Sequence, residues 1–220
     1  MTENRSTVQN LAQQYIEADQ PTAWFEVLYS QANNDEKLIP WADMKPNHNL
    51  VQWLDDHKIQ TPGKTALVIG CGLGDDAEEL SKRGFNVTAF DISPSAIEWC
   101  KQRFPDSSVN YQVADLLNPP SEWKQNFDFI LESYTLQSLP PSLSNQAIDI
   151  IAKFLSAQGT LLIICRGRNP EDKLDKVPYP LTKNDVMKFV DIGLSLVDFE
   201  DYFDHLDSQP TRRFRITFTK

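Results

Sequence analysis

From residue 65 onward, short apolar runs alternate with segments in which apolar residues recur every three or four positions. Uninterrupted runs such as ALVI and LLIIC are typical of strands that are buried on both faces of a parallel sheet. Spacings of three or four residues are those of a helix with one buried face. The pattern predicts strands at 65–69, 86–90, 109–113, 127–131 and 160–165, and helices at 75–83, 94–104 and 143–155.

The two ends of the chain depart from this alternation. Before residue 60 the sequence predicts a polar helix at 6–16 and two helices with an apolar face at 22–32 and 50–57, with a loop at 33–49 that carries Trp41. Near the other end, the segment TKND predicts a capping box that starts a helix at 182–190. Two further strands, at 194–203 and 212–218, follow as a hairpin. The whole pattern predicts an α/β fold made of βαβ units, with a hairpin added to its parallel sheet.

The charge balance of the chain limits the classes of partner that it can bind. The chain has 220 residues and a net charge of −10, with a pI near 4.7. A nucleic-acid surface needs clustered Lys and Arg, so this balance argues against nucleic acid and against an anionic membrane surface. Arg212, Arg213 and Arg215 follow an acidic block, and we interpret them as charge balance on a solvated face. An acidic domain without an obvious interface helix is compatible with a monomer.

Sequence signals also bear on location and on metals. No apolar stretch approaches the 18 or so residues that span a bilayer, and the N-terminal segment has no apolar signal core. Three cysteines form no CxxC pair, and three scattered histidines show no zinc-ligand spacing. We therefore expect a cytoplasmic protein with no metal site.

The most informative motif is VIGCGLG, which follows the first strand of the alternating region. A glycine-rich turn between a strand and a helix lets a ligand approach the backbone closely. Asp91 closes the next apolar run, where a carboxylate can accept hydrogen bonds from both ribose hydroxyls. Nicotinamide dinucleotides and adenosylmethionine both fit this arrangement, so the two features alone leave both cofactors open.

Two details favour adenosylmethionine. A dinucleotide fingerprint reads GxGxxG, whereas Gly70, Gly72 and Gly74 give GxGxG. The following helix opens with the acidic residues DDAEE. A pyrophosphate at that helix N-terminus would face like charges, whereas a sulfonium cofactor carries no phosphate.

At this point the chain resembles the class I S-adenosylmethionine-dependent methyltransferases. The matching segments are VIGCGLG, VTAFDIS, VADL, FDFILES and LSAQGTLLII, in the family's order over residues 65 to about 166. The resemblance implies a Rossmann-like, doubly wound, seven-stranded sheet that is mostly parallel with an antiparallel last strand. It also implies residues 1–60 as an N-terminal helical lid and residues 61–220 as the cofactor-binding core of one structural domain.

Candidate site residues follow from the motifs and the resemblance. Gly70, Cys71, Gly72 and Asp91 are the expected cofactor-binding residues of the glycine loop, with Cys71 as a small apolar filler and not a nucleophile. The resemblance implies that Ile92 flanks the adenine, that Asp115 accepts from the adenine amino group and that Leu116 packs near the ring. For Asp115, an Asx turn is the competing interpretation. Glu132 and Tyr134 follow the fourth strand and Arg166 ends the fifth, where the family's substrate pocket lies, so these three are candidate catalytic residues, and Glu132 is also a candidate cofactor contact.

A weaker resemblance extends beyond the core. LIPWADMKPN and KVPYPLT are similar to segments of the thiopurine and thiol/halide methyltransferase-like subgroup, in which a tryptophan closes over the cofactor. Trp41 is the matching cofactor-binding lid residue, although aromatic residues at helical spacing are also typical of core packing.

The expected activity is methyl transfer from S-adenosylmethionine to a small molecule with a thiol, halide, hydroxyl or amine acceptor, leaving S-adenosylhomocysteine. A hydroxyl or amine would call for a general base, for which Glu132, Tyr134 and Asp43 are candidates. A non-catalytic adenosylmethionine-binding regulator and an NAD(P)-dependent oxidoreductase remain as alternatives.

Overall fold

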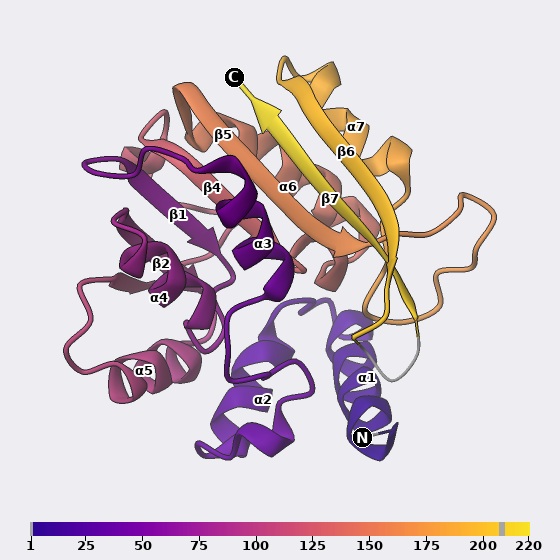
Figure 1. The fold of residues 1–220 in the computed structure, drawn as a ribbon. Coiled ribbons are helices and arrows are strands. Elements are labelled where there is room, and N and C mark those ends of the chain that lie inside the picture. Colours follow the sequence, from indigo (N-terminus) through magenta and orange to yellow (C-terminus); the bar gives the residue numbers. More distant parts are fainter. Residues whose placement is uncertain (1, 207–209) are drawn as a thin grey trace. The chain divides into compact units, whose positions relative to one another are not determined.

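The computed structural model describes residues 2–206 and 210–220. Its contacts divide the chain into two compact units, residues 1–118 and residues 119–220, and each is described by itself (Figure 1). The predicted division into a lid at 1–60 and a core at 61–220 concerns a different boundary and stays a prediction.

The first unit consists of helices followed by a βαβαβ segment. Ser93 caps the N-terminus of α5 by accepting from the Ala96 N–H at 3.0 Å, and Pro94 occupies the first turn. Asn47 caps α3 in the same way, accepting from the Asn49 N–H at 3.0 Å. The elements are α1 (Thr2–Glu17), α2 (Ala23–Ala32), η1 (Glu36–Leu38), α3 (His48–His57), β1 (Thr65–Ile69), α4 (Asp75–Lys82), β2 (Asn86–Asp91), α5 (Pro94–Arg103) and β3 (Asn110–Val113).

The second unit contains the remaining four strands. Its α7 begins with the predicted capping box, in which Thr182 and Asp185 each accept from the other's backbone N–H. Strand β7 lies between β5 and β6 and runs antiparallel to both (Figure 1). The elements are η2 (Ser121–Trp123), β4 (Phe127–Ser133), η3 (Leu136–Ser138), α6 (Pro141–Phe154), β5 (Leu155–Arg166), α7 (Lys183–Asp191), β6 (Ser195–Asp204) and β7 (Thr211–Thr219).

The strand order is β3-β2-β1-β4-β5-β7-β6 in a seven-stranded sheet. Pairing is parallel in β1–β2, β2–β3 and β4–β5 and antiparallel in β5–β7 and β6–β7. The predicted fold, a mostly parallel Rossmann-like sheet with an antiparallel last strand, is confirmed.

Burial follows the apolar runs of the sequence. Residues 66–69 of β1 and 161–165 of β5 are at most 2% exposed, as expected for strands covered on both faces. Strand β6 differs, because most of its residues are at least partly exposed. The strand ends next to these buried runs carry the residues of functional interest.

Candidate functional site

The glycine loop connects β1 to α4 and depends on backbone conformations that suit glycine. Gly70, Gly72 and Gly74 all have positive φ, at 58°, 53° and 90°. A Cβ at Gly74 would lie 2.6 Å from the Tyr111 hydroxyl, and one at Gly72 would lie 3.1 Å from the Tyr29 hydroxyl. A side chain at either position would therefore be strained by the backbone conformation, and at Gly74 the Tyr111 hydroxyl would also have to move.

Asp91 is held directly against this loop. Its Oδ2 accepts from the Gly72 N–H at 3.0 Å, and its Oδ1 accepts from the Ser93 N–H at 3.0 Å. The side chain is buried, and burial raises the pKa of its carboxyl to about 6, although the backbone hydrogen bonds act in the opposite direction. Two motifs that are separated in the sequence thus form one cluster, and Ile92 follows directly as a half-buried residue.

The predicted adenine residues lie at the end of the neighbouring strand. The Ala114 N–H donates to the Asp91 carbonyl at 3.0 Å, which brings Asp115 close to the glycine-loop cluster. The Asp115 Oδ1 accepts from the Leu117 N–H at 2.9 Å, so the carboxylate does form the Asx turn. Leu116 is buried. An adenine contact through the second oxygen of Asp115 stays a prediction.

Trp41 belongs to the same unit as the glycine loop. Its indole Nε1 donates to the Tyr29 hydroxyl at 2.9 Å, and its ring meets Trp24 edge-on at 6.1 Å between centroids. Trp41 is 43% exposed, whereas Tyr29 is buried. Because the Tyr29 hydroxyl also lies close to Gly72, Trp41 is linked to the loop through one hydrogen bond and one close contact. Its predicted role as a cofactor-binding residue is not tested by this arrangement.

Glu26 is a member of this cluster that the sequence patterns did not indicate. Its carboxylate accepts from the Ser93 hydroxyl at 2.6 Å, the Ser95 hydroxyl at 2.7 Å and the Ser95 N–H at 3.1 Å. These bonds fasten α2 to the N-terminus of α5, next to Asp91. In the sequence, Glu26 is visible as an acidic residue within the apolar stripe of 22–32. Its serine partners could not be identified from the sequence, because they lie 67 and 69 residues away along the chain.

The acids at the start of α4 need a different interpretation from the one based on sequence. Asp75 forms a bidentate ion pair with Arg103, with both hydrogen bonds at 2.8 Å. Asp76 accepts from the Asn47 N–H at 2.7 Å, and burial raises the pKa of its carboxyl to about 6. The negative charge at this helix start is thus partly offset, and the electrostatic case against a pyrophosphate is weaker than the letters DDAEE suggest.

Cys71 in the glycine loop has the character of a filler. A hydrogen bond with Cys100 and burial raise the pKa of its thiol well above the usual range. Since the thiolate is the reactive form of cysteine, a nucleophilic role is disfavoured.

In the second unit, Glu132 is a fully buried carboxyl near the end of β4. Its Oε1 accepts from the Leu136 N–H at 2.8 Å, and its Oε2 is buried with no hydrogen-bond partner among the described residues. Burial raises the pKa of Glu132 to about 7, against the opposing effect of hydrogen bonds from the Leu136 and Thr135 N–H groups. A carboxyl that titrates near neutral pH has the pKa expected of a general base.

The titration of Glu132 leads to a stability prediction. Because the pKa of Glu132 is higher in the folded state than in the unfolded chain, this carboxyl stabilises the fold when the pH lies below its unfolded-state pKa. That stability is lost as pH rises through about 7. We expect Glu132→Gln to raise the free energy of unfolding at pH 8 by about 3 kcal/mol, because no charge is then buried, and to change it little at pH 4.5. Urea unfolding of both proteins at pH 4.5 and 8 measures this. Asp76 and Asp91 titrate in both proteins, so equal pH dependence of the two would contradict the prediction.

Tyr134 and Arg166 lie close to a third residue, Arg213. Tyr134 has a φ of 65°, and its ring lies 5.1 Å from the Arg213 guanidinium carbon. Arg166 is directly opposite Arg213 in the β5–β7 register. Register places Glu132 differently, because it pairs with Ile163 and therefore lies on the face of Cys165, opposite to that of Arg166. The catalytic roles predicted for these residues stay predictions.

The basic cluster near the C-terminus is not a solvated face, contrary to expectation. Arg213 and Arg215 are each only 6% exposed, because alternation along β7 turns them to the same covered side. Arg215 forms a bidentate pair with Glu200 at 2.6 and 2.7 Å. Arg212 alone fits the expected role, with its ion pair to Asp201 at 2.7 Å on the other side of the strand.

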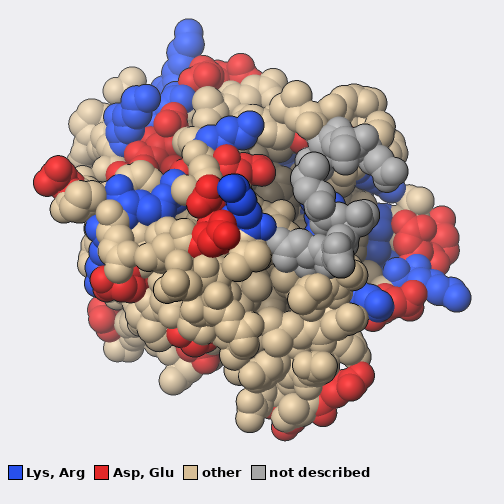
Figure 2. Space-filling view, turned by 90° about the horizontal axis from the view of Figure 1, so that it is seen from below, with Lys and Arg blue, Asp and Glu red and all other residues tan. Residues whose placement is uncertain are grey.

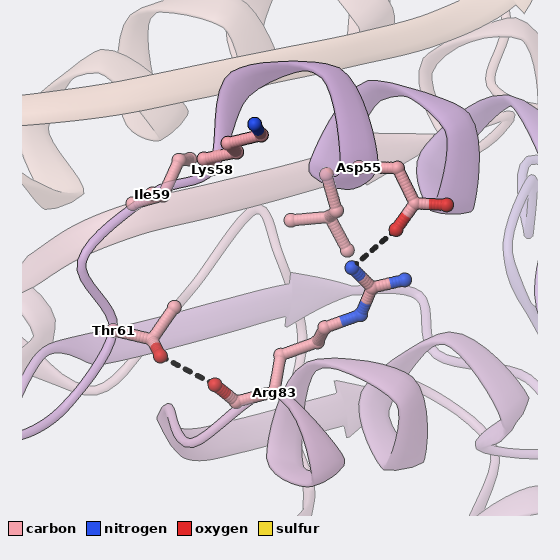
Figure 3. Close-up of a pocket in the computed structure, with 6 residues that line it drawn as sticks. Asp55, Lys58, Ile59, Thr61 and Arg83 are labelled. Carbon is pink, nitrogen blue, oxygen red and sulfur yellow. Dashed lines mark hydrogen bonds and ion pairs between the residues drawn. The ribbon is translucent and has the colours of Figure 1, made fainter.

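A surface hollow of about 290 Å³ lies elsewhere in the first unit, lined by Leu54, Asp55, Lys58, Ile59, Thr61 and Arg83 (Figure 3). The guanidinium group of Arg83 is bound by Asp55 at 2.6 Å and by Glu79 at 2.8 Å, and Thr61 donates to the Arg83 carbonyl (Figure 3). These bonds tie α3 to α4. The lining includes none of the predicted site residues, and we attribute the hollow to the packing of α3 against α4.

Asp43, a candidate base, lies exposed in the loop after Trp41.

Across residues 2–206 and 210–220, no three His, Cys, Asp or Glu side chains are grouped as a metal site would require. None of the helices in these ranges has the length and apolar content that a membrane crossing needs.

Comparison with known proteins identifies the core. Residues 66–159 match the family model described as a methyltransferase domain. A ubiquinone biosynthesis O-methyltransferase from Xanthomonas campestris pv. campestris (strain B100) is 29% identical over 115 residues, covering 51% of this chain and 47% of that protein. A malonyl-[acyl-carrier protein] O-methyltransferase from Anoxybacillus flavithermus (strain DSM 21510 / WK1) is 30% identical over 148 residues, covering 66% and 56%. The chain thus spans about half the length of these relatives.

Solved structures agree on the fold. The N-methyltransferase NodS from Bradyrhizobium japonicum WM9, in complex with S-adenosylhomocysteine, aligns with a TM-score of 0.69 at 22% identity, covering 88% of this chain and 96% of that one. The thiopurine and thiol/halide subgroup is not shown by the comparisons and stays a prediction. The motifs, the strand order and the matched residues agree, and together they support a class I S-adenosylmethionine-dependent methyltransferase, with residues 66–159 as the matched methyltransferase domain.

Proposed function

We propose that this protein binds S-adenosylmethionine at the glycine-loop cluster and transfers its methyl group to a small-molecule acceptor. The observation that carries the proposal is the placement of Asp91, whose buried carboxylate is hydrogen-bonded to the Gly72 N–H. This contact places a carboxylate beside a glycine turn whose backbone a ligand can approach closely, and a ribose-bearing cofactor requires both features. NodS, with its bound S-adenosylhomocysteine, supports the same cofactor.

The chemistry is an in-line displacement in which the acceptor atom bonds to the methyl carbon as the carbon–sulfur bond breaks. The sulfur keeps the electron pair of that bond and becomes a neutral thioether. Alignment of the two reactants and exclusion of water provide most of the rate gain in such a step. A thiolate or halide needs no proton removal, whereas a hydroxyl or amine requires a base.

A small-molecule acceptor is also favoured by charge. The net charge is −10, and on the face shown in Figure 2 the described Lys and Arg side chains are interspersed with Asp and Glu and form no continuous basic field. A nucleic-acid acceptor would require such a field. We accordingly propose a small molecule as the partner of this chain.

A ligand panel tests the cofactor assignment. At a concentration of 100 times the dissociation constant, S-adenosylhomocysteine should raise the melting temperature by roughly 5–10 °C, because binding to the folded state adds about 2.7 kcal/mol of stability. NADH and NADPH should leave it unchanged. Stabilisation by a nicotinamide dinucleotide without stabilisation by S-adenosylhomocysteine would overturn the proposal.

Turnover is tested separately with methyl-labelled S-adenosylmethionine and a panel of thiols, halides, phenols, amines and carboxylic acids. Transfer of label to any of these supports catalysis and names the acceptor atom. Tight cofactor binding with no transfer across the panel would instead favour the regulatory alternative.

A further inference from the structure

Three residues form a row across the second unit, one on each of its last three strands. Arg166 ends β5, Arg213 lies directly opposite it on β7, and Tyr202 lies opposite Arg213 on β6. Side chains of directly opposed residues point to the same face of a sheet. The Gly167 N–H donates to the Arg212 carbonyl at 3.0 Å, so Arg166 and Arg213 form the closer, non-hydrogen-bonded kind of pair.

The two arginines of this row differ from ordinary surface charges. Arg213 is 6% exposed, and Arg166 is half-buried. Like charges directly opposite each other on a sheet are unfavourable, and the guanidinium group does not lose its charge in proteins. Asp204 lies 3.7 Å from the Arg213 Nε. The register places both arginine side chains on one face of the sheet, and a guanidinium group carries N–H donors whose planar geometry matches a carboxylate or a phosphate.

The surroundings position the Arg213 side chain and the backbone of Arg166. Tyr134 lies under the Arg213 guanidinium group at 5.1 Å, and its N–H donates to the Ile164 carbonyl at 3.0 Å. Its left-handed backbone conformation, with φ at 65°, is unusual for a tyrosine and is the kind of strain found at functional sites. Buried Gln137 accepts from the Arg166 N–H at 2.7 Å, which fixes the end of β5.

We propose that Arg166 and Arg213 bind an anionic group of the methyl acceptor, a carboxylate or a phosphate, with Tyr134 as the ring that orients Arg213. The acceptor class is then a small organic acid or phosphate ester. The identification of the bound molecule as the methyl acceptor rests on the proposed function. The anion subsite itself is a property of the second unit and can be tested without turnover.

Calorimetric titration with three simple probes tests the subsite: benzoate, phenyl phosphate and the neutral isostere benzamide. We expect at least one of the two anions to bind at least tenfold more tightly than benzamide, and comparison of the two identifies the preferred anion. Arg166→Gln and Arg213→Gln should each weaken that anion at least tenfold. Arg212→Gln removes one positive charge from the opposite side of the same strand and should leave anion affinity unchanged.

Equal affinity for the anions and benzamide, no binding of any probe, or full anion affinity in both arginine variants would overturn the proposal. Because Arg213→Gln leaves buried Asp204 without this cation and can impair folding, Arg213→Lys serves as a second variant that keeps the charge and loses the planar fork. It should fold and still weaken the anion. S-adenosylhomocysteine affinity of the wild-type protein separates the two proposals. Absence of S-adenosylhomocysteine binding refutes the cofactor assignment, whereas a wild-type protein that binds S-adenosylhomocysteine but neither anion refutes the subsite.

Discussion

Replacing Asp91 with alanine is expected to weaken S-adenosylhomocysteine binding by at least about 100-fold, because two hydrogen bonds from ribose hydroxyls to a buried carboxylate are lost and each contributes about 1.5–3 kcal/mol. The same change removes the acceptor of the Gly72 and Ser93 N–H groups, so the glycine loop also loses its fixed position. Calorimetric titration of the wild-type protein and the variant measures the effect.

Two comparisons make the Asp91 prediction specific. Asp106→Ala removes the same charge from an exposed loop of the first unit and should leave the dissociation constant unchanged. Because the Asp91 pKa is about 6, protonation should weaken binding in the wild-type protein as pH falls from 7.5 to 5. Asp91→Asn should lose that part of the pH dependence. An unaltered dissociation constant in Asp91→Ala would refute the ribose assignment.

Much of the fold follows from the sequence because the relevant signals are local. The apolar run that ends at Ile69 and the capping residues Ser93 and Thr182 act over one strand or one helical turn, and the structure contains the elements they predict. The larger errors in element bounds occur in β5, which starts at Leu155 and not at residue 160. Those extra residues gain strand character from pairing, since Leu155 is opposite Phe127, and no local signal records that pairing.

The candidate site was less predictable because its key contacts are long-range. The glycine loop and Asp91 carry a recognisable spacing, so their association could be expected. The burial of Arg213 depends on the register of β7 with β5 and β6, and alternation along the strand gives no sign of which face is covered. The conformation of Tyr134 likewise depends on its hydrogen bond to Ile164, which only the assembled strands create.

Glu26 presents the same difficulty, and its removal is the second large expected effect. Its carboxylate accepts three hydrogen bonds from Ser93 and Ser95. Burial alone would raise its pKa, but the bonds from the two serines outweigh burial and hold the pKa below the usual value. A lowered pKa means that this stability is present above pH 4.5 and is lost as pH falls through the folded-state pKa.

We expect Glu26→Ala to lower the free energy of unfolding at pH 7 by about 2 kcal/mol. This value is smaller than the summed contribution of three hydrogen bonds to a charged group, because the carboxylate is only half-buried and is partly screened by solvent. Urea unfolding followed by circular dichroism measures the loss. Glu98→Ala, an exposed change on α5 whose partner is Gln102, should have little effect. Equal stabilities of the Glu26 and Glu98 variants would show that the three bonds contribute nothing in solution.

The Glu26 variant also tests the lid predicted for residues 1–60. Glu26 fastens α2 at Ser93, next to Asp91, while Tyr29 of the same helix lies close to Gly72. If the N-terminal segment must move for the cofactor to enter and leave, loss of this fastening should raise both the association and the dissociation rate constants of S-adenosylhomocysteine. Stopped-flow tryptophan fluorescence, with Trp24 and Trp41 as reporters, measures both. A packing segment that does not gate the site would leave the association rate constant unchanged, since only the stability of the bound state would then depend on α2.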